Sequence, residues 1–125
     1  MKLTIDNRKA NKGSHTEHVN ATYDFANLLM NSLDGTNHTL LVLEREDKWQ
    51  MMIGGGNERY VVTLSSQKDE NYVLENLVAN GKAEVELCAG GQVGYYPDNI
   101  VVDVCCAREA IGKFYSGLEA ELAWS

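Results

Sequence analysis

Three groups of residues in this sequence could carry chemistry: a histidine pair, two adjacent cysteines and two glycine-rich runs. His15 and His18 lie three positions apart with Glu17 between them, so two imidazoles and a carboxylate could approach one metal ion. The segment around them is polar, and His38 is distant along the chain. We therefore expect no metal site and no cofactor.

The adjacent cysteines, Cys105 and Cys106, fall in the first turn of a predicted helix, where the helix dipole can lower the pKa of a thiol. A nucleophilic thiol also needs a base, and no histidine lies near them in the sequence. The cysteine count is odd and no CxxC spacing occurs, so reduced structural thiols are expected. A thiol enzyme remains an alternative, but the sequence favours a protein that is not an enzyme.

The glycine-rich runs, MIGGGNERY and AGGQVG, invite comparison with phosphate-binding loops. Neither contains GxGxxG or Gly-Lys-Ser/Thr. The element expected after each run is a strand, not a helix whose N-terminus could hold a phosphate. We therefore predict a hairpin turn at residues 54–57 and a turn or bulge at Gly90 and Gly91. A small ligand-binding domain that uses these glycine-rich turns is the alternative.

The elements that position these groups follow from the hydrophobic periodicity. Strands are predicted at residues 2–6, 39–44, 49–53, 59–65, 84–88, 92–96, 99–102 and 118–124. Helices are predicted at residues 19–33, with Asn20 or Thr22 as cap and Asp34-Gly35 as stop, and from the Asp103 cap to Ser116, with Gly117 as stop. Residues 7–16 and 66–83 are predicted to be loops, the second interrupted by short apolar stretches at 72–74 and 77–78.

Apolar residues at helical spacing define the face that each helix should bury. These faces are Phe25, Leu28, Leu29 and Leu33 in the first helix, and Val104, Ala107, Ala110, Ile111 and Phe114 in the second. The order of elements predicts an α+β fold, with two main α-helices packed on a single antiparallel β-sheet. The 125 residues are expected to form one domain, 1–125.

Charge limits the classes of partner. The chain has a net charge of −7, and residues 13–125 hold seven basic and 17 acidic side chains. Nucleic acids and anionic membranes would repel such a surface, whereas a basic protein would be attracted to it. Acidity that serves only solubility is the alternative. No apolar run reaches the length of a membrane span and the N-terminus lacks an apolar signal stretch, so we expect a cytoplasmic protein.

Two long stretches carry a resemblance to a known family. They are WQMMIGGGNERYVVTLS at residues 49–65 and AGGQVGYYPDNIVVDVCCAREAIGKFYSG at residues 89–117, followed by a terminal Trp124. Their order is similar to immunity protein family 1 of bacterial polymorphic toxin and contact-dependent inhibition systems, over residues 39–125. The residues that match the family pattern are Gly90, Gly91, Pro97, Val101, Val102, Ala107, Ala110, Phe114, Tyr115 and Trp124. Residues 118–121 lack the proline that the family often has before the tryptophan.

The resemblance implies a cytoplasmic antitoxin that binds a cognate toxin domain, a nuclease or a nucleic-acid deaminase, and occludes its active site or substrate cleft. The matching motif residues would be structural. A toxin that acts on nucleic acid presents a basic cleft, where the carboxylates of the immunity protein can take the place of phosphates. The candidate contact residues are acids beside aromatics in two turns: Glu44, Glu46, Asp47 and Trp49, and Asp69, Glu70 and Tyr72. Solvated turns without a partner are the alternative for each of them.

Overall fold

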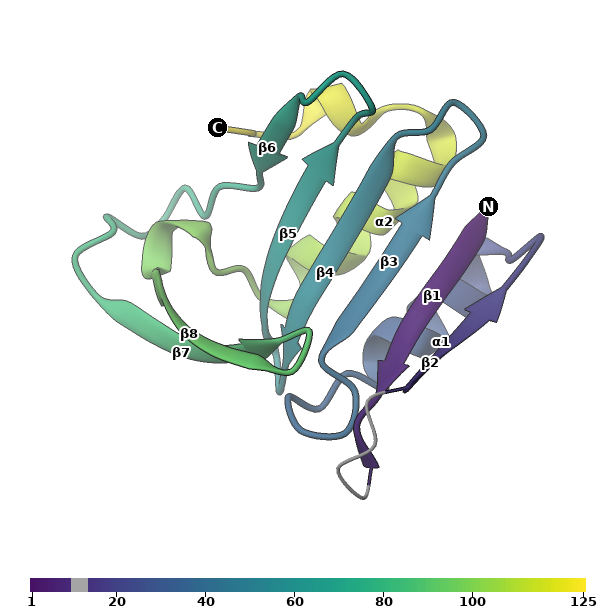
Figure 1. Cartoon of the computed structure of the whole chain (residues 1–125). Coiled ribbons are helices and arrows are strands. Elements are labelled where there is room, and N and C mark those ends of the chain that lie inside the picture. Colours follow the sequence, from purple (N-terminus) through teal and green to yellow (C-terminus); the bar gives the residue numbers. More distant parts are fainter. Residues whose placement is uncertain (10–13) are drawn as a thin grey trace.

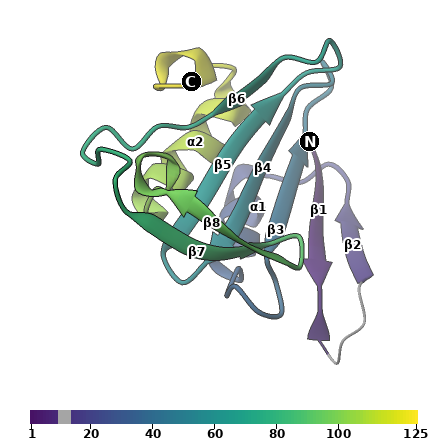
Figure 2. The same cartoon turned by 60° about the vertical axis from the view of Figure 1, so that its left-hand side comes forward.

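A computed structural model of the protein describes residues 1–9 and 14–125. In these residues a six-stranded antiparallel sheet, in the order β2-β1-β3-β4-β5-β6, forms the central layer. Both α-helices cover one face of this sheet, and a separate β7–β8 hairpin crosses part of the other face (Figure 1 and Figure 2). The predicted α+β class, an antiparallel sheet with two helices packed on it, is confirmed, although the strands predicted at 84–88 and 92–96 form a separate two-stranded sheet and not part of a single one.

The strands are β1 (Lys2–Asn7), β2 (Ser14–His18), β3 (Leu40–Glu44), β4 (Gln50–Gly56), β5 (Arg59–Ser65), β6 (Asn71–Val73), β7 (Glu84–Ala89) and β8 (Gln92–Pro97). The α-helices are α1 (Tyr23–Asn31) and α2 (Val104–Ser116), and two short 3₁₀ helices are η2 (Asp98–Ile100) and η3 (Glu119–Glu121). No helix in the described part of the chain is both long and apolar enough to span a membrane.

The core lies between the sheet and the two helices. Because side chains alternate along a strand, every second residue of the central strands is buried there. These residues are Leu3, Ile5, Leu41, Leu43, Met51, Ile53, Val62 and Leu64. On α2 the predicted face is confirmed, since Ala107, Ala110, Ile111 and Phe114 are buried against them. A smaller cluster, centred on Val61, Leu87 and Val101, packs the β7–β8 hairpin onto the opposite face.

The two helices agree with the sequence to different degrees. Asp103 caps α2 by accepting from the N–H of Cys106 at 2.9 Å, and Gly117 ends it with a φ of 72°, as predicted. Helix α1 is shorter than predicted, because Thr22 caps it directly before Tyr23 and it ends at Asn31, ahead of Asp34 and Gly35.

The buried stripe of α1 agrees with the prediction in part, because Leu33 is buried and Phe25 and Leu29 are half-buried against the core. Ala26 and Met30 are fully buried, whereas Leu28 is 63% exposed. The prediction omitted Ala26 and Met30, although both pack in the core between α1 and the sheet. The face is therefore rotated toward the i, i+4 pair Ala26 and Met30.

Two further predictions are corrected by strand pairing. Ser14–His18 forms β2 where part of a loop was predicted, and its residues pair with β1 alone although they lack apolar alternation. Residues 10–13 of that predicted loop lie outside the described residues. Gly54, Gly55 and Gly56 belong to β4, and the β4–β5 turn consists of Asn57 and Glu58, both with positive φ.

The C-terminal segment does not form the predicted strand at 118–124. It forms η3, and only Trp124 makes a bridge, to Leu74. The alternation of apolar and acidic residues resembled a strand, but Glu119 is held by Arg45 instead of pairing in a sheet. Residues 99–102 likewise include the end of η2, with a single bridge between Val102 and Tyr60.

Candidate partner-binding surface

The seven predicted contact residues lie at one end of the sheet. Antiparallel connections between β3 and β4 and between β5 and β6 turn at the same end, which is the upper end in Figure 1. The rings of Trp49 and Tyr72 stack there, with centroids 6.4 Å apart and an interplanar angle of 23°. Two segments that are separate in the sequence therefore meet at this end of the sheet. We call this region the acidic end: Glu44, Glu46, Asp47, Trp49, Asp69, Glu70 and Tyr72.

Some carboxylates of the acidic end already have partners within the chain. Glu44 lies 3.7 Å from the ammonium of Lys48, and Asp47 lies 2.9 Å from the guanidinium of Arg45. Hydrogen bonds from Arg45 lower the pKa of Asp47. The carboxylate of Glu70 accepts a hydrogen bond from the Ser66 hydroxyl at 3.2 Å. These contacts hold the shape of the two turns.

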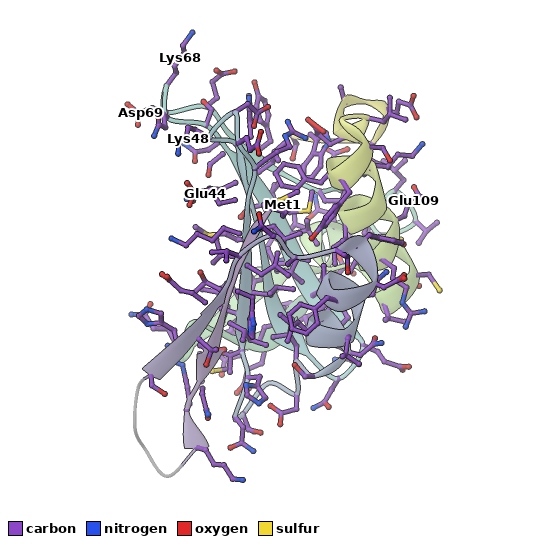
Figure 3. All side chains as sticks on the ribbon, turned by 90° about the vertical axis from the view of Figure 1, so that its right-hand side faces the viewer. Met1, Glu44, Lys48, Lys68, Asp69 and Glu109 are labelled. Atoms are coloured by element: carbon purple, nitrogen blue, oxygen red, sulfur yellow. The ribbon has the colours of Figure 1, made fainter. Side chains whose placement is uncertain are left out.

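Glu46 and Asp69 are the carboxylates best placed to meet a partner. Both side chains are exposed, and neither forms a salt bridge within the part of the chain that the structure describes. In Figure 3, Asp69 and the neighbouring Lys68 project from the end of the sheet, beyond Glu44 and Lys48. A basic surface could therefore reach Glu46 and Asp69 without breaking contacts inside the protein.

The acidic end is attached to the C-terminal segment by Arg45. Its guanidinium forms two hydrogen bonds to the Glu119 carboxylate, donates to the Phe114 carbonyl at 2.9 Å and lies 4.4 Å from the centroid of the Phe114 ring. The indole N–H of Trp124 donates to the Glu119 carbonyl at 2.7 Å. Hydrogen bonds from Arg45 lower the pKa of Glu119, and the same pair raises the pKa of Arg45.

Sequence reasoning missed Arg45 and Glu119, although both support the predicted surface. A lone arginine beside Glu44, Glu46 and Asp47 was the available signal. Its carboxylate partner could not be identified, because the pairing depends on how the C-terminal segment folds back over α2.

Among the residues that match the family motif, Gly90 and Gly91 form the two-residue turn between β7 and β8, with φ values of 61° and 78°. A turn of this kind requires positive φ at both positions, so the predicted turn is confirmed. The Gly91 N–H donates to the Thr39 hydroxyl at 3.0 Å. A Cβ atom at Gly91 would lie 2.3 Å from the Arg8 guanidinium carbon, so this turn sits directly on the start of β3 and the end of β1.

A buried carboxylate, Asp6, organises the contacts beneath the Gly90-Gly91 turn. It accepts from the backbone N–H groups of Thr39 and Leu40 at 2.6 and 2.9 Å, and from the Thr39 hydroxyl and Arg8 Nε at 2.5 and 2.8 Å. Burial raises the pKa of Asp6, but these hydrogen bonds outweigh it and lower the pKa. Asp6 therefore joins β1 to the start of β3. Both of its carboxylate oxygens already accept two hydrogen bonds each.

The other motif residues also lie at structural positions. Pro97 ends β8, where it pairs with Glu84, and the chain then enters η2. Phe114 is fully buried beneath Arg45, and Trp124 bridges to Leu74. Each of these residues lies where two elements meet.

The alternative of a ligand site at the glycine-rich turns meets a hydrogen-bonding obstacle. Gly35, Gly55 and Gly56 line an open depression of about 570 Å³ together with Arg59 and Glu86. The N–H groups of Gly35 and Gly55 donate to the carbonyls of His38 and Thr39 at 3.2 and 3.0 Å. They are therefore not free to hold a phosphate in the way that a phosphate-binding loop does.

The histidine pair is separated by the pleat of β2. His15 is opposite Asp6 and His18 is opposite Leu3, and residues three apart in a strand point to opposite faces of the sheet. The His18 ring contacts Phe25 edge-on, at 4.8 Å between centroids. Within residues 1–9 and 14–125, no group of three His, Cys, Asp or Glu side chains is arranged to hold a metal ion.

The two adjacent cysteines lie at the start of α2, but the pKa of Cys106 is raised where the helix dipole was expected to lower it. Cys105 and Cys106 are exposed, free thiols at the start of α2. Burial and the carboxylate of Asp103 raise the pKa of Cys106. The carboxylate of Asp103, which caps the helix, thus opposes the effect of the helix dipole, which was expected to lower the pKa of the thiol.

Searches against models of known protein families and against curated proteins find no match to this chain.

Proposed function

We propose that this protein is an inhibitor that binds a basic partner protein through the acidic end and occludes its substrate cleft. The observation that carries the proposal is the stacking of the partly exposed Trp49 on Tyr72, which brings two acidic turns together at one end of the sheet. The partner we propose is a bacterial toxin domain that acts on nucleic acid, as the resemblance to immunity protein family 1 implies.

Electrostatics supports this class of partner. A net charge of −7 steers a basic protein toward the surface and can raise the association rate by roughly 10- to 1,000-fold at low salt. Steering alone does not give a long-lived complex, because most differences in affinity come from the dissociation rate. The Trp49–Tyr72 stack supplies aromatic area that is already ordered before binding, and aromatic anchors of this kind dominate many interfaces.

Inhibition by occlusion does not require catalysis. The acids of the acidic end are paired with lysine and arginine or are exposed, and Asp6 is saturated by hydrogen bonds. None of these arrangements is that of a general acid beside a nucleophile. We therefore propose a binding protein rather than an enzyme.

Co-expression with a toxin domain encoded beside its gene tests the proposal. We expect the two proteins to co-purify as a stoichiometric complex, and cells that express both to grow where cells that express the toxin alone do not. The matched control is a toxin domain from an unrelated gene pair, which should not be neutralised. Absence of both the complex and the rescue of growth would refute the proposed function for that pair.

A further inference from the structure

A groove lined by none of the residues of the acidic end was not anticipated from the sequence. It lies between the irregular segment after β6, the first half of α2 and the C-terminal segment, and has a volume of about 520 Å³. We call it the α2 groove. It is lined by residues 74–78, Val102, Asp103, Cys106, Glu109, Glu121, Leu122 and Ala123. Glu109 lies on the side of α2 that faces away from the sheet (Figure 3).

The α2 groove has an apolar floor and an apolar rim. Leu74 and Val102 are buried beneath it, at 5% and 2% exposure, and Leu122 is half-buried. On the rim, Leu77 and Val78 are 76% and 96% exposed. Two adjacent aliphatic side chains that are exposed to solvent at the rim of a groove are typical of an interaction site, whereas single exposed aliphatic side chains are common on protein surfaces.

The charges that line the groove have one sign. Glu75, Asp103, Glu109 and Glu121 contribute carboxylates, and no lysine or arginine is among the lining residues that the structure describes. Lys113 approaches from outside and lies 2.6 Å from the Glu121 carboxylate. The groove therefore combines an apolar surface with a negative potential, which is complementary to a long cationic side chain. The methylene groups of such a side chain can lie on aliphatic residues while its charged end reaches carboxylates.

We infer that the α2 groove is a docking site for a basic segment of a partner protein, with an arginine side chain in the groove. Its stem lies over Leu74 and Val102, its guanidinium faces Glu75 and Glu109, and an adjacent aliphatic residue packs on Val78. Arginine fits better than lysine because its planar fork can bind carboxylates on two sides. The inference rests on the proposed function only in that this segment belongs to the same basic partner.

A titration with peptides tests the groove independently of any toxin. The amide resonances of the isotope-labelled protein are followed by NMR while acetyl-Leu-Arg-Leu-Arg-amide is added, and acetyl-Leu-Glu-Leu-Glu-amide serves as the control peptide. We expect saturable shifts for residues 74–78 and 103–109, weakened by salt, with the arginine peptide alone. Equal shifts with both peptides, shifts confined to the acidic end, or no shifts would overturn the inference.

Surface variants sharpen the test, since the side chains involved are exposed and their replacement leaves the core intact. Val78→Ser and Glu109→Gln should each weaken binding of the arginine peptide several-fold, while Val93→Ser on β8 and Glu84→Gln on β7 should not. In the complex with the toxin domain, Val78→Ser and Glu109→Gln together should raise Kd about tenfold or more. A complex that forms but is insensitive to these variants refutes the groove and leaves the proposed function standing. Binding of the arginine peptide without any toxin complex supports the groove and refutes the proposed function.

Discussion

Arg45 and Glu119, which lie 74 positions apart in the sequence, form a bidentate ion pair with N–O distances of 2.8 and 3.0 Å. Their side chains are only 20% and 14% exposed, so water screens the pair weakly. Arg45 also lies over the ring of Phe114. A single side chain thus ties the β3–β4 turn of the acidic end to the buried end of α2 and to η3.

Replacing Glu119 with glutamine should destabilise the protein by about 2 kcal/mol, because a charged hydrogen-bonding partner of a partly buried guanidinium is lost. Unfolding in urea, followed by tryptophan fluorescence, measures the change. The matched control is Glu121→Gln, two residues away, whose ion pair with Lys113 is at the surface and should contribute little. Equal losses in the two variants would contradict the role of the Arg45 pair.

The acid stability of the protein should depend on Asp34. Burial raises the pKa of this group, but hydrogen bonds from the backbone N–H groups of His38, Thr36 and Asn37 outweigh it and lower the pKa to about 2. Because the pKa is lower in the folded state than the ordinary 3.8, the stabilisation is present above pH 3.8 and is lost as the pH falls toward about 2.

In the variant Asp34→Asn, the side chain keeps an oxygen that can accept hydrogen bonds, but it no longer carries an ionisable group. It should be less stable than the parent at neutral pH, and its free energy of unfolding should decline less steeply across the same acidic range. Urea unfolding at a series of pH values compares the two proteins. Parallel pH profiles would show that Asp34 does not contribute in this way.

Gly90 and Gly91 offer a matched pair within one turn. Alanine at either position costs about 1 kcal/mol or more, because a non-glycine residue is strained at positive φ. At Gly90 the new Cβ meets nothing closer than 3.6 Å, whereas at Gly91 it would lie 2.3 Å from the Arg8 guanidinium. Gly91→Ala should therefore lower the unfolding midpoint more than Gly90→Ala, since Arg8 must leave Asp6. An equal effect would mean that the Arg8–Asp6 contact adds no stability.

Reversing the charges of Glu46 and Asp69, which form no ion pair with any residue that the structure describes, should slow association with a basic partner. The double variant Glu46→Lys and Asp69→Lys is expected to reduce the association rate about tenfold at low salt and to weaken its salt dependence. Glu84→Lys with Glu86→Lys makes the same change in net charge on β7. Stopped-flow mixing with the toxin domain distinguishes the two. If the β7 variant slows binding as much, net charge rather than this surface determines the rate.

Asp47 is unsuitable for this test. Its carboxylate lies 2.9 Å from Arg45, so a lysine there would disturb the ion pair of Arg45 with Glu119 as well as the surface charge. A loss of binding in such a variant could not be assigned to either cause.

Cys106 should react slowly with alkylating reagents. Burial and Asp103 raise its pKa, and the thiolate is the reactive form. In a protein that retains Cys106 alone, the rate of alkylation should rise with pH with an inflection above the ordinary value of 9.0. Asp103→Asn, which retains a capping oxygen, should lower that inflection. Rapid labelling at neutral pH would revive the hypothesis of a thiol enzyme.

Local patterns were sufficient for much of the fold. Helix α2 was predicted from its apolar spacing, the cap at Asp103 and the stop at Gly117, because each of these signals acts within a few residues. The central strands were predicted from alternation. The same reasoning failed for β2, whose polar residues form a strand only because β1 offers an edge, and for residues 118–124, where alternation was not accompanied by pairing.

The surface was predicted in parts but not as a whole. Acids beside aromatics indicated the β3–β4 turn and the β5–β6 loop separately. The α2 groove had no signal of its own, because its floor, rim and carboxylates come from three distant segments. Leu77 and Val78 looked like an apolar interruption in a loop.

Composition, periodicity and caps thus determined the α+β class, the second helix, the position of most strands and the acidic character of the protein, since these depend on neighbouring residues alone. Tertiary structure decided that Asp47 pairs with Arg45, whereas Glu46 and Asp69 form no salt bridge within the described part of the chain. It also decided that Glu119 is an anchor and not part of a strand. The physical reason is that ion pairs, ring stacking and grooves depend on distances across the folded chain, and separation along the sequence does not specify those distances.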